Sequence, residues 1–259
     1  MSVPSVPSAS PSAHAAKVPA ATLGFWVLKI LATTLGETGG DTLSMSAGLG
    51  YLASSALFAL LFAALTAAAL AAPRFHPLLY WATILASTLF GTTLADFADR
   101  SLGIGYLGGS ALLAALLLLV LGLGVWRTGS LAPSRIVTRE AEAFYWLAIT
   151  FAQTLGTALG DAAADAAGLG FGPAALLFGA LIALTALSWR GGLLSGAAAF
   201  WTAFVLTRPL GATLGDLLDK PPAEGGFGLS RAAASLVLLV LFALVFALRP
   251  SRPAAAASG

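Results

Sequence analysis

Residues 26–41 read WVLKILATTLGETGGD, and the same spaced pattern occurs three more times along the chain. Residues 81–96 read WATILASTLFGTTLAD, residues 146–161 read WLAITFAQTLGTALGD, and residues 201–216 read WTAFVLTRPLGATLGD. Each copy begins with a tryptophan that follows an aromatic residue, has a glycine ten residues later and has an aspartate fifteen residues later. Four occurrences exclude chance, so the sequence predicts four tandem repeats.

The composition excludes an ordinary soluble protein. Only 9% of the 259 residues are charged and 58% are hydrophobic, whereas soluble domains carry about 25% charged residues. Because a helix needs about 20 apolar residues to cross a bilayer, we expect an all-α polytopic membrane protein with two spans per repeat and pseudo-symmetry about the membrane normal. The eight apolar stretches are residues 23–44, 51–72, 77–99, 106–126, 141–165, 172–189, 193–219 and 229–248.

One membrane domain built from four repeats is therefore expected, at residues 19–75, 76–130, 131–192 and 193–248. Segments 1–18 and 249–259 are rich in Ser, Pro and Ala and are expected to be disordered tails. The tryptophans lie 55, 65 and 55 residues apart, and the extra ten residues fall in the loop at 127–140. Repeats 2 and 4 also share a D-x-x-D-base ending, which predicts two halves of two repeats each.

The pattern W-x9-G-x3-[GA]-D, followed in three copies by G-x-G and an aromatic residue, resembles a bacterial integral membrane family of unknown function. That family has four tandem repeats, each with two transmembrane segments and a characteristic tryptophan. The resemblance covers about residues 19–248 and implies this architecture without a biochemical activity. The segment GETGGDT at 36–42 is also similar to the E-x-G-D-K/R-T motif of a manganese and calcium transporter family, with an extra glycine between Glu37 and Asp41 and no base after the aspartate.

On a helix, positions +7, +11, +15 and +18 or +19 from each tryptophan lie on one face. These positions contain eight of the eleven acidic residues of the chain. Ionisable groups inside a membrane are costly and usually mark an ion path, although solvated helix ends at the headgroup level are an alternative. The predicted cation-binding residues are Glu37, Asp41, Asp96, Asp99, Asp161, Asp165, Asp216 and Asp219, supported by Thr33, Thr92, Gln153 and Thr157.

Three further groups of residues are singled out by their place in the repeat. Arg208 and Lys29 are predicted counter-ion or gating residues; the alternatives are a structural ion pair for Arg208 and a side chain that snorkels to the interface for Lys29. The tryptophans Trp26, Trp81, Trp146 and Trp201 are interpreted as interfacial anchors, with ligand contact as the alternative. Small residues at +10 and +14 predict close helix packing at Gly36, Gly40, Gly91, Gly156, Gly160, Gly211 and Gly215.

The chain has no cysteine and only two histidines, His14 and His76, which disfavours sites for soft metals. Carboxylate and hydroxyl oxygens suit hard cations. We therefore expect a transporter or channel for a divalent cation, Mn²⁺ or Mg²⁺, linked to protons. The alternative is a structural or regulatory membrane protein without a transported substrate. Catalytic motifs are not found, so the chain is not expected to be an enzyme or to carry a covalent cofactor.

The basic residues are distributed unequally between the two ends of the predicted helices. Eight lie in the N-terminal segment, the loops after spans 2, 4 and 6 and the C-terminal segment, and only Arg100, Lys220 and Arg231 lie at the other end. The positive-inside rule then predicts a bacterial cytoplasmic membrane protein with both termini in the cytoplasm. Its expected partners are the lipid bilayer, an inorganic cation and protons, and not nucleic acid; a homo-oligomer remains open.

Overall fold

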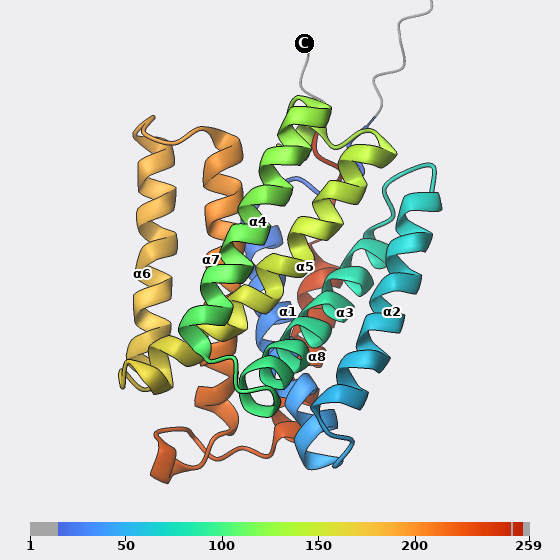
Figure 1. Cartoon of the computed structure of the whole chain (residues 1–259). Helices are drawn as coiled ribbons and strands as arrows, with labels where there is room; N and C mark the ends of the chain where they lie inside the picture. Colours follow the sequence, from blue (N-terminus) through green and yellow to red (C-terminus); the bar gives the residue numbers. More distant parts are fainter. Residues whose placement is uncertain (1–14, 250, 256–259) are drawn as a thin grey trace, which may run out of the picture.

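The computed structural model of the protein describes residues 15–249 and 251–255. Within these residues the chain folds into eight α-helices joined by short turns (Figure 1). They confirm the eight predicted helices and begin and end close to the apolar stretches of the sequence. The helices are α1 (Leu23–Asp41), α2 (Tyr51–Ala71), α3 (Pro77–Asp96), α4 (Tyr106–Thr128), α5 (Arg139–Asp161), α6 (Phe171–Arg190), α7 (Gly196–Asp219) and α8 (Arg231–Leu248).

Short polar side chains mark where several helices begin. The hydroxyl groups of Thr22, Thr138 and Ser195 accept hydrogen bonds from backbone N–H groups in the first turns of α1, α5 and α7. His76 accepts the corresponding bond in α3, and Pro77 occupies the first helical position. These caps satisfy N–H groups that have no partner inside the helix. The repeat tryptophans follow within the first eight residues of these helices.

The helices α1, α3 and α5 pass directly into a π-helical turn after the repeat aspartate, at Thr42–Ser46, Phe97–Ser101 and Ala162–Ala166. The chain then reverses through two glycines with positive φ, such as Gly48 at 72° and Gly50 at 78°. Only glycine adopts this conformation without strain, which explains the repeated G-x-G motif. In the fourth repeat a 3-10 turn at Pro222–Glu224 replaces the π-helical turn.

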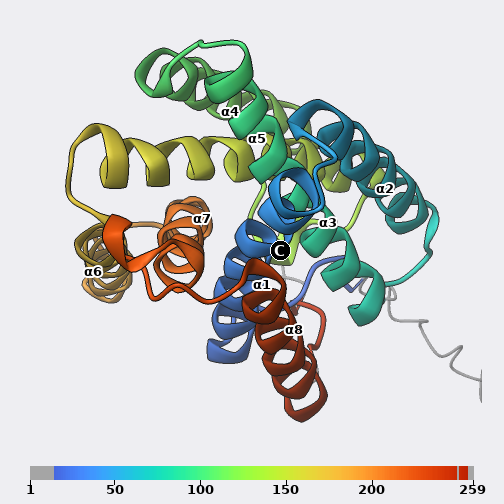
Figure 2. The same ribbon diagram turned by 90° about the horizontal axis from the view of Figure 1, so that it is seen from below.

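The four repeats form a closed ring. Helices α1, α3, α5 and α7 surround the centre, and each contacts the next one around the ring. Each even-numbered helix packs mainly against the first helix of the following repeat: α2 on α3, α4 on α5, α6 on α7, and α8 on α1 (Figure 2). Contact between α8 and α1 closes the ring. The sequence predicted two halves of two repeats each, whereas the structure has four similar interfaces between successive repeats.

Glycine sets the spacing of the inner helices. A Cβ atom added at Gly36, at position +10, would lie less than 3 Å from Thr88, at position +7 of the next repeat. The same clash occurs between Gly91 and Gln153, between Gly156 and Arg208, and between Gly211 and Thr33. The predicted packing glycines therefore do lie at helix interfaces, where a small residue lets two backbones approach closely.

The outer surface of the ring is apolar. In the described part of the chain, five helices are long and apolar enough to cross a membrane: α2, α3, α4, α6 and α8. Leucines of the outer helices are strongly exposed, for example Leu118 at 68% and Leu176 at 77%. Exposed apolar side chains at this density require lipid, and the chain is a polytopic membrane protein.

The segments next to the two termini pair with each other. Pro19 forms an antiparallel bridge with Pro253, and the backbone N–H of Ala254 donates to the carbonyl of Val18 at 2.9 Å. Ala16 and Val18 are buried. The expected tails at 1–18 and 249–259 include the described residues 15–18, 249 and 251–255, part of which form this pairing; residues 1–14, 250 and 256–259 lie outside the described part.

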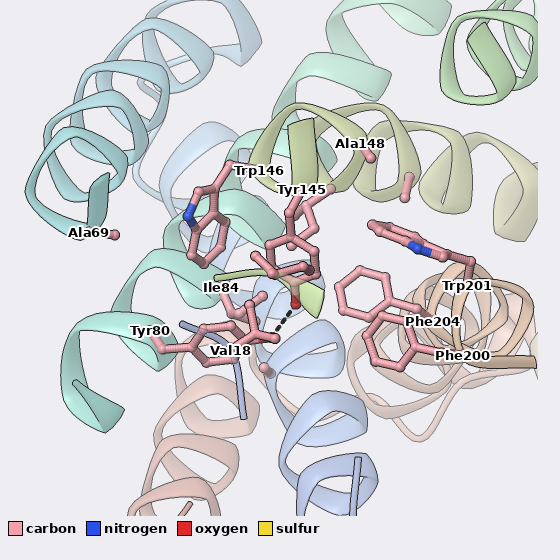
Figure 3. Close-up of a cluster of buried hydrophobic side chains, with 14 of the residues drawn as sticks. Val18, Ala69, Tyr80, Ile84, Tyr145, Trp146, Ala148, Phe200, Trp201 and Phe204 are labelled. Carbon is pink, nitrogen blue, oxygen red and sulfur yellow. Dashed lines mark hydrogen bonds between the residues drawn. The ribbon is translucent and has the colours of Figure 1, made fainter. Parts of the chain in front are cut away.

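An aromatic cluster fills the ring at the end that carries the termini (Figure 3). The hydroxyl groups of Tyr80 and Tyr145 are hydrogen bonded at 2.5 Å across the centre. Trp81, Trp146 and Trp201 are buried around this pair. Their indole N–H groups donate to Ser251, Glu142 and Leu131.

This placement of the repeat tryptophans differs from the predicted interfacial anchors, because three of the four contact protein instead of lipid. The tryptophans with exposed rings are Trp126 at 78% and Trp189 at 53%, close to the ends of α4 and α6. Each is followed directly by an arginine. A tryptophan beside a basic residue is the usual composition of a helix end at the membrane interface, so these two positions fit that role better.

Candidate functional site

The polar faces of α1, α3, α5 and α7 meet inside the ring, as their spacing predicted. At positions +7 and +11 the side chains are buried: Thr33, Thr88, Gln153 and Arg208, then Glu37, Thr92, Thr157 and Ala212. At position +15 the four repeat aspartates form an aspartate layer, Asp41, Asp96, Asp161 and Asp216, each at most 5% exposed. The chain thus gathers four carboxylates at one level, toward the end of the bundle that lies opposite the termini.

Three carboxylates come closest together at the interface of repeats 4 and 1. Oxygen atoms of Glu37, Asp41 and Asp216 lie within 4.8 Å of one another, and we call these residues the acid triad. The Oδ1 atom of Asp41 is buried and has no hydrogen-bond partner among the described residues. A buried carboxylate oxygen without a partner is unfavourable; the basic side chains near Asp41 lie beside its other oxygen, Oδ2.

Arg208 lies on the side of the acid triad that faces the termini. Its guanidinium donates to Glu37 Oε2 at 2.9 Å and to the carbonyl of Thr33 at 3.3 Å, and it also contacts the hydroxyl of Thr92. The Arg208 side chain is fully buried. Gly156 makes room for it, because any side chain there would overlap the arginine. Arg208 is therefore an internal counter-ion of the triad.

Lys29 is the second cation in the interior. Its Nζ atom lies 4.1 Å from the centre of the Phe204 ring and donates to Gln153 Oε1 at 3.5 Å. The residue is completely buried, so its side chain does not reach the interface as the snorkelling interpretation required. Gln153 also donates to Ser87. Gln153 therefore supports Lys29 and contacts none of the aspartates.

Three basic residues cover the aspartate layer from the end opposite the termini. Arg100 Nε lies 2.7 Å from Asp96, and its Nη2 atom lies 3.9 Å from Asp161. Lys220 Nζ lies 3.1 Å from Asp216 and 3.6 Å from Asp41. Arg231 Nε lies 3.5 Å from Asp41 and 3.8 Å from Asp219. Each base thus bridges two acids.

Lys220 follows the last residue of α7 and lies beside two carboxylates. Burial opposes its charge, but the carboxylates of Asp216 and Asp41 outweigh this effect and raise the pKa of Lys220 above its usual value. These basic partners were not among the predicted site residues. The repeat contained a signal for two of them, because a base four residues after an aspartate can pair with it on a helix. Arg231 has no such signal.

The structure places the other predicted residues at different distances from the triad. Thr92 lies beside Glu37, with its hydroxyl 3.4 Å from Oε2. Thr157 is buried but hydrogen bonds to the carbonyl of Gln153 in its own helix. Asp99 is half-buried and Asp165 is exposed, so for these two aspartates the solvated interpretation fits better than cation binding.

A repeat of unknown function, DUF347, matches residues 24–75, 79–130, 144–191 and 199–250. The chain belongs to the DUF347 family. Each matched copy of DUF347 covers one inner and one outer helix, which agrees with the four repeats read from the tryptophans. The chain matches no curated protein and no solved structure.

Proposed function

We propose that this DUF347 protein binds a hard cation at the acid triad and carries it across a membrane. The observation that carries the proposal is the convergence of Glu37, Asp41 and Asp216 within 4.8 Å inside a membrane helix ring. Three carboxylates offer the oxygen ligands that Mn²⁺ and Mg²⁺ prefer. The Thr92 hydroxyl lies beside Glu37, and no thiolate ligand is available, since the chain has no cysteine.

Both ends of the ring are closed, which favours a carrier rather than a permanently open pore. The tyrosine pair and the surrounding aromatic side chains fill the end that carries the termini. The aspartate layer is covered at the opposite end by Arg100, Lys220 and Arg231. A cation bound at the triad would be enclosed from both sides, and its passage requires each side to open in turn.

The charges favour linkage to protons. Closely spaced carboxylates repel one another unless a cation or a proton neutralises them. A divalent cation that enters the triad would displace protons or the basic side chains paired with it. The basic side chains would pair with the acids again when the ion departs. We further propose that the basic end with the termini faces the cytoplasm of a bacterial cell, as the positive-inside rule predicts.

The proposal is tested by Mn²⁺ uptake into proteoliposomes with and without a pH gradient. We expect uptake by the wild-type protein, stimulation by the gradient and a loss of at least tenfold in Asp41→Asn and Asp216→Asn. Glu224→Gln is the matched control, because Glu224 is an exposed acid outside the ring and its neutralisation should change uptake little. Equal uptake by all variants would remove the triad from the mechanism.

A structural role without transport is the second candidate. It is favoured by the ion pairs of the triad, because Arg208, Lys220 and Arg231 already neutralise its acids. A scaffold of this kind would lose stability in Asp41→Asn but would bind no Mn²⁺ in any form. Calorimetric titration of the purified protein with Mn²⁺ separates the two candidates.

A further inference from the structure

We infer that Lys220 is the gate of the acid triad on the side opposite the termini. This inference rests on the proposed function. The ammonium group of Lys220 lies 3.1 Å from Asp216 and 3.6 Å from Asp41, between two of the three triad carboxylates. A bound cation would need these same carboxylates. Lys220 therefore acts as a tethered cation that holds the site until the ion replaces it.

Lys220 stands where α7 ends and a loop begins, with its backbone hydrogen bonded to Asp216 and Gly228 at 2.9 Å. Lys220 follows the last residue of α7, and Pro221 and Pro222 come directly after it. Proline has no backbone N–H to continue a helix, so Lys220 is carried by a loop. This loop is the insertion that replaces the π-helical turn of the other repeats. The lysine can leave the triad without a shift of α7, whereas Arg208 is fixed within the helix.

The equivalent residue in repeat 2 provides an internal comparison. Arg100 also lies nineteen residues after its tryptophan, and it bridges Asp96 and Asp161 as Lys220 bridges Asp216 and Asp41. At the interface of repeats 2 and 3, however, the residue equivalent to Glu37 is Thr157, which also lies eleven residues after its tryptophan. The Arg100 side chain is 37% exposed, whereas that of Lys220 is 10% exposed.

This comparison distinguishes the two bases. Arg100 pairs with two carboxylates at the edge of the ring, whereas Lys220 pairs with Asp216 and Asp41, two of the three carboxylates of the triad. Arg208 stands on the other side of the same triad and pairs with Glu37 at 2.9 Å. The triad is thus enclosed by Arg208 on one side and by Lys220 and Arg231 on the other. Entry of an ion from the side opposite the termini requires Lys220 to leave and allows Arg208 to stay.

The test measures equilibrium binding of Mn²⁺ to the full chain in nanodiscs. The variants are Lys220→Met, Lys220→Arg, Arg100→Met and Asp41→Asn. Removal of a competing charge within 4 Å of the site should tighten Mn²⁺ binding about tenfold or more in Lys220→Met. Lys220→Arg keeps the charge and should bind like the wild type. Arg100→Met should change affinity less than Lys220→Met, and Asp41→Asn should abolish binding.

Thermal unfolding provides a second measurement that also reports misfolding of the variant. Lys220→Met leaves the triad without its gate cation, so its melting temperature should fall without metal and recover when Mn²⁺ binds. The surface variant Arg127→Met, which breaks an exposed ion pair with Glu140, should show neither effect. A merely structural lysine would lower the melting temperature in the same way but would give no gain in Mn²⁺ affinity.

The outcomes separate the two proposals. If the wild type binds Mn²⁺, Asp41→Asn does not, and Lys220→Met binds equally or more weakly, the gate is overturned and the proposed function stands. If neither the wild type nor Lys220→Met binds Mn²⁺, the proposed function fails and the gate fails with it. Tighter binding in Lys220→Met, together with wild-type affinity in Lys220→Arg, supports both.

Discussion

The ion pair between Arg208 and Glu37 should be strongly coupled, because both side chains are buried, at 0% and 5% exposure, and their nearest charged atoms lie 2.9 Å apart. Removal of one partner leaves the other charge buried without compensation, which costs about 3–5 kcal/mol. We therefore expect Glu37→Gln and Arg208→Met each to destabilise the protein by about this amount. The double variant leaves no uncompensated charge at either position and should cost less than about 2 kcal/mol.

The measurement is a double-mutant cycle, with unfolding followed by the fluorescence of the six tryptophans. The matched control is the pair of Arg127 and Glu140, which has a similar separation of 2.9 Å but is 56% and 48% exposed. An exposed pair contributes about 0–1 kcal/mol, so Arg127→Met and Glu140→Gln should have little effect. The reasoning is refuted if the losses in unfolding free energy of Glu37→Gln and Arg208→Met simply add in the double variant, as they do for independent sites.

Two further predictions concern packing and orientation. Gly156→Ala places a Cβ atom against Arg208 and should destabilise the ring by about 1–3 kcal/mol. Gly179 lies on α6 with open space around it, so Gly179→Ala should be neutral or stabilising by up to about 1 kcal/mol. Equal effects of the two substitutions on the melting temperature would contradict the packing. A cysteine introduced at Ser134, in a chain without native cysteine, should react with an impermeant maleimide only after the bacterial cells are opened, and labelling of intact cells would reverse the proposed orientation.

The repeated features were predictable because they depend on local spacing. Asp41, Asp96, Asp161 and Asp216 stand at the same distance from their tryptophans, so a helical period is sufficient to place them on one face. Gly156 and its equivalents were predictable for the same reason. The sequence therefore contained both the inner ring of helices and the polar interior.

Features that depend on contacts between distant segments were not predictable. α2 is apolar on nearly all sides, and its sequence gives no reason to pack on α3 instead of α1. Trp81 is buried because its indole group meets Ser251 and Phe242, and no local pattern reveals partners more than 150 residues away. Lys29 is buried for a similar reason: whether a long basic side chain snorkels depends on the neighbours that enclose it, here Gln153 and Phe204.

The ring has nearly fourfold packing but not fourfold charge, and this difference locates the candidate site. At the interface of repeats 4 and 1, positions +7 and +11 hold Arg208 and Glu37. The corresponding residues at the other three interfaces carry no charge, for example Thr88 and Thr157 between repeats 2 and 3. An uncompensated buried charge is costly, so the arginine makes the third carboxylate of the triad tolerable. Glycine packing can keep four equivalent interfaces while one ion pair lets a single interface hold the three carboxylates of the proposed cation site.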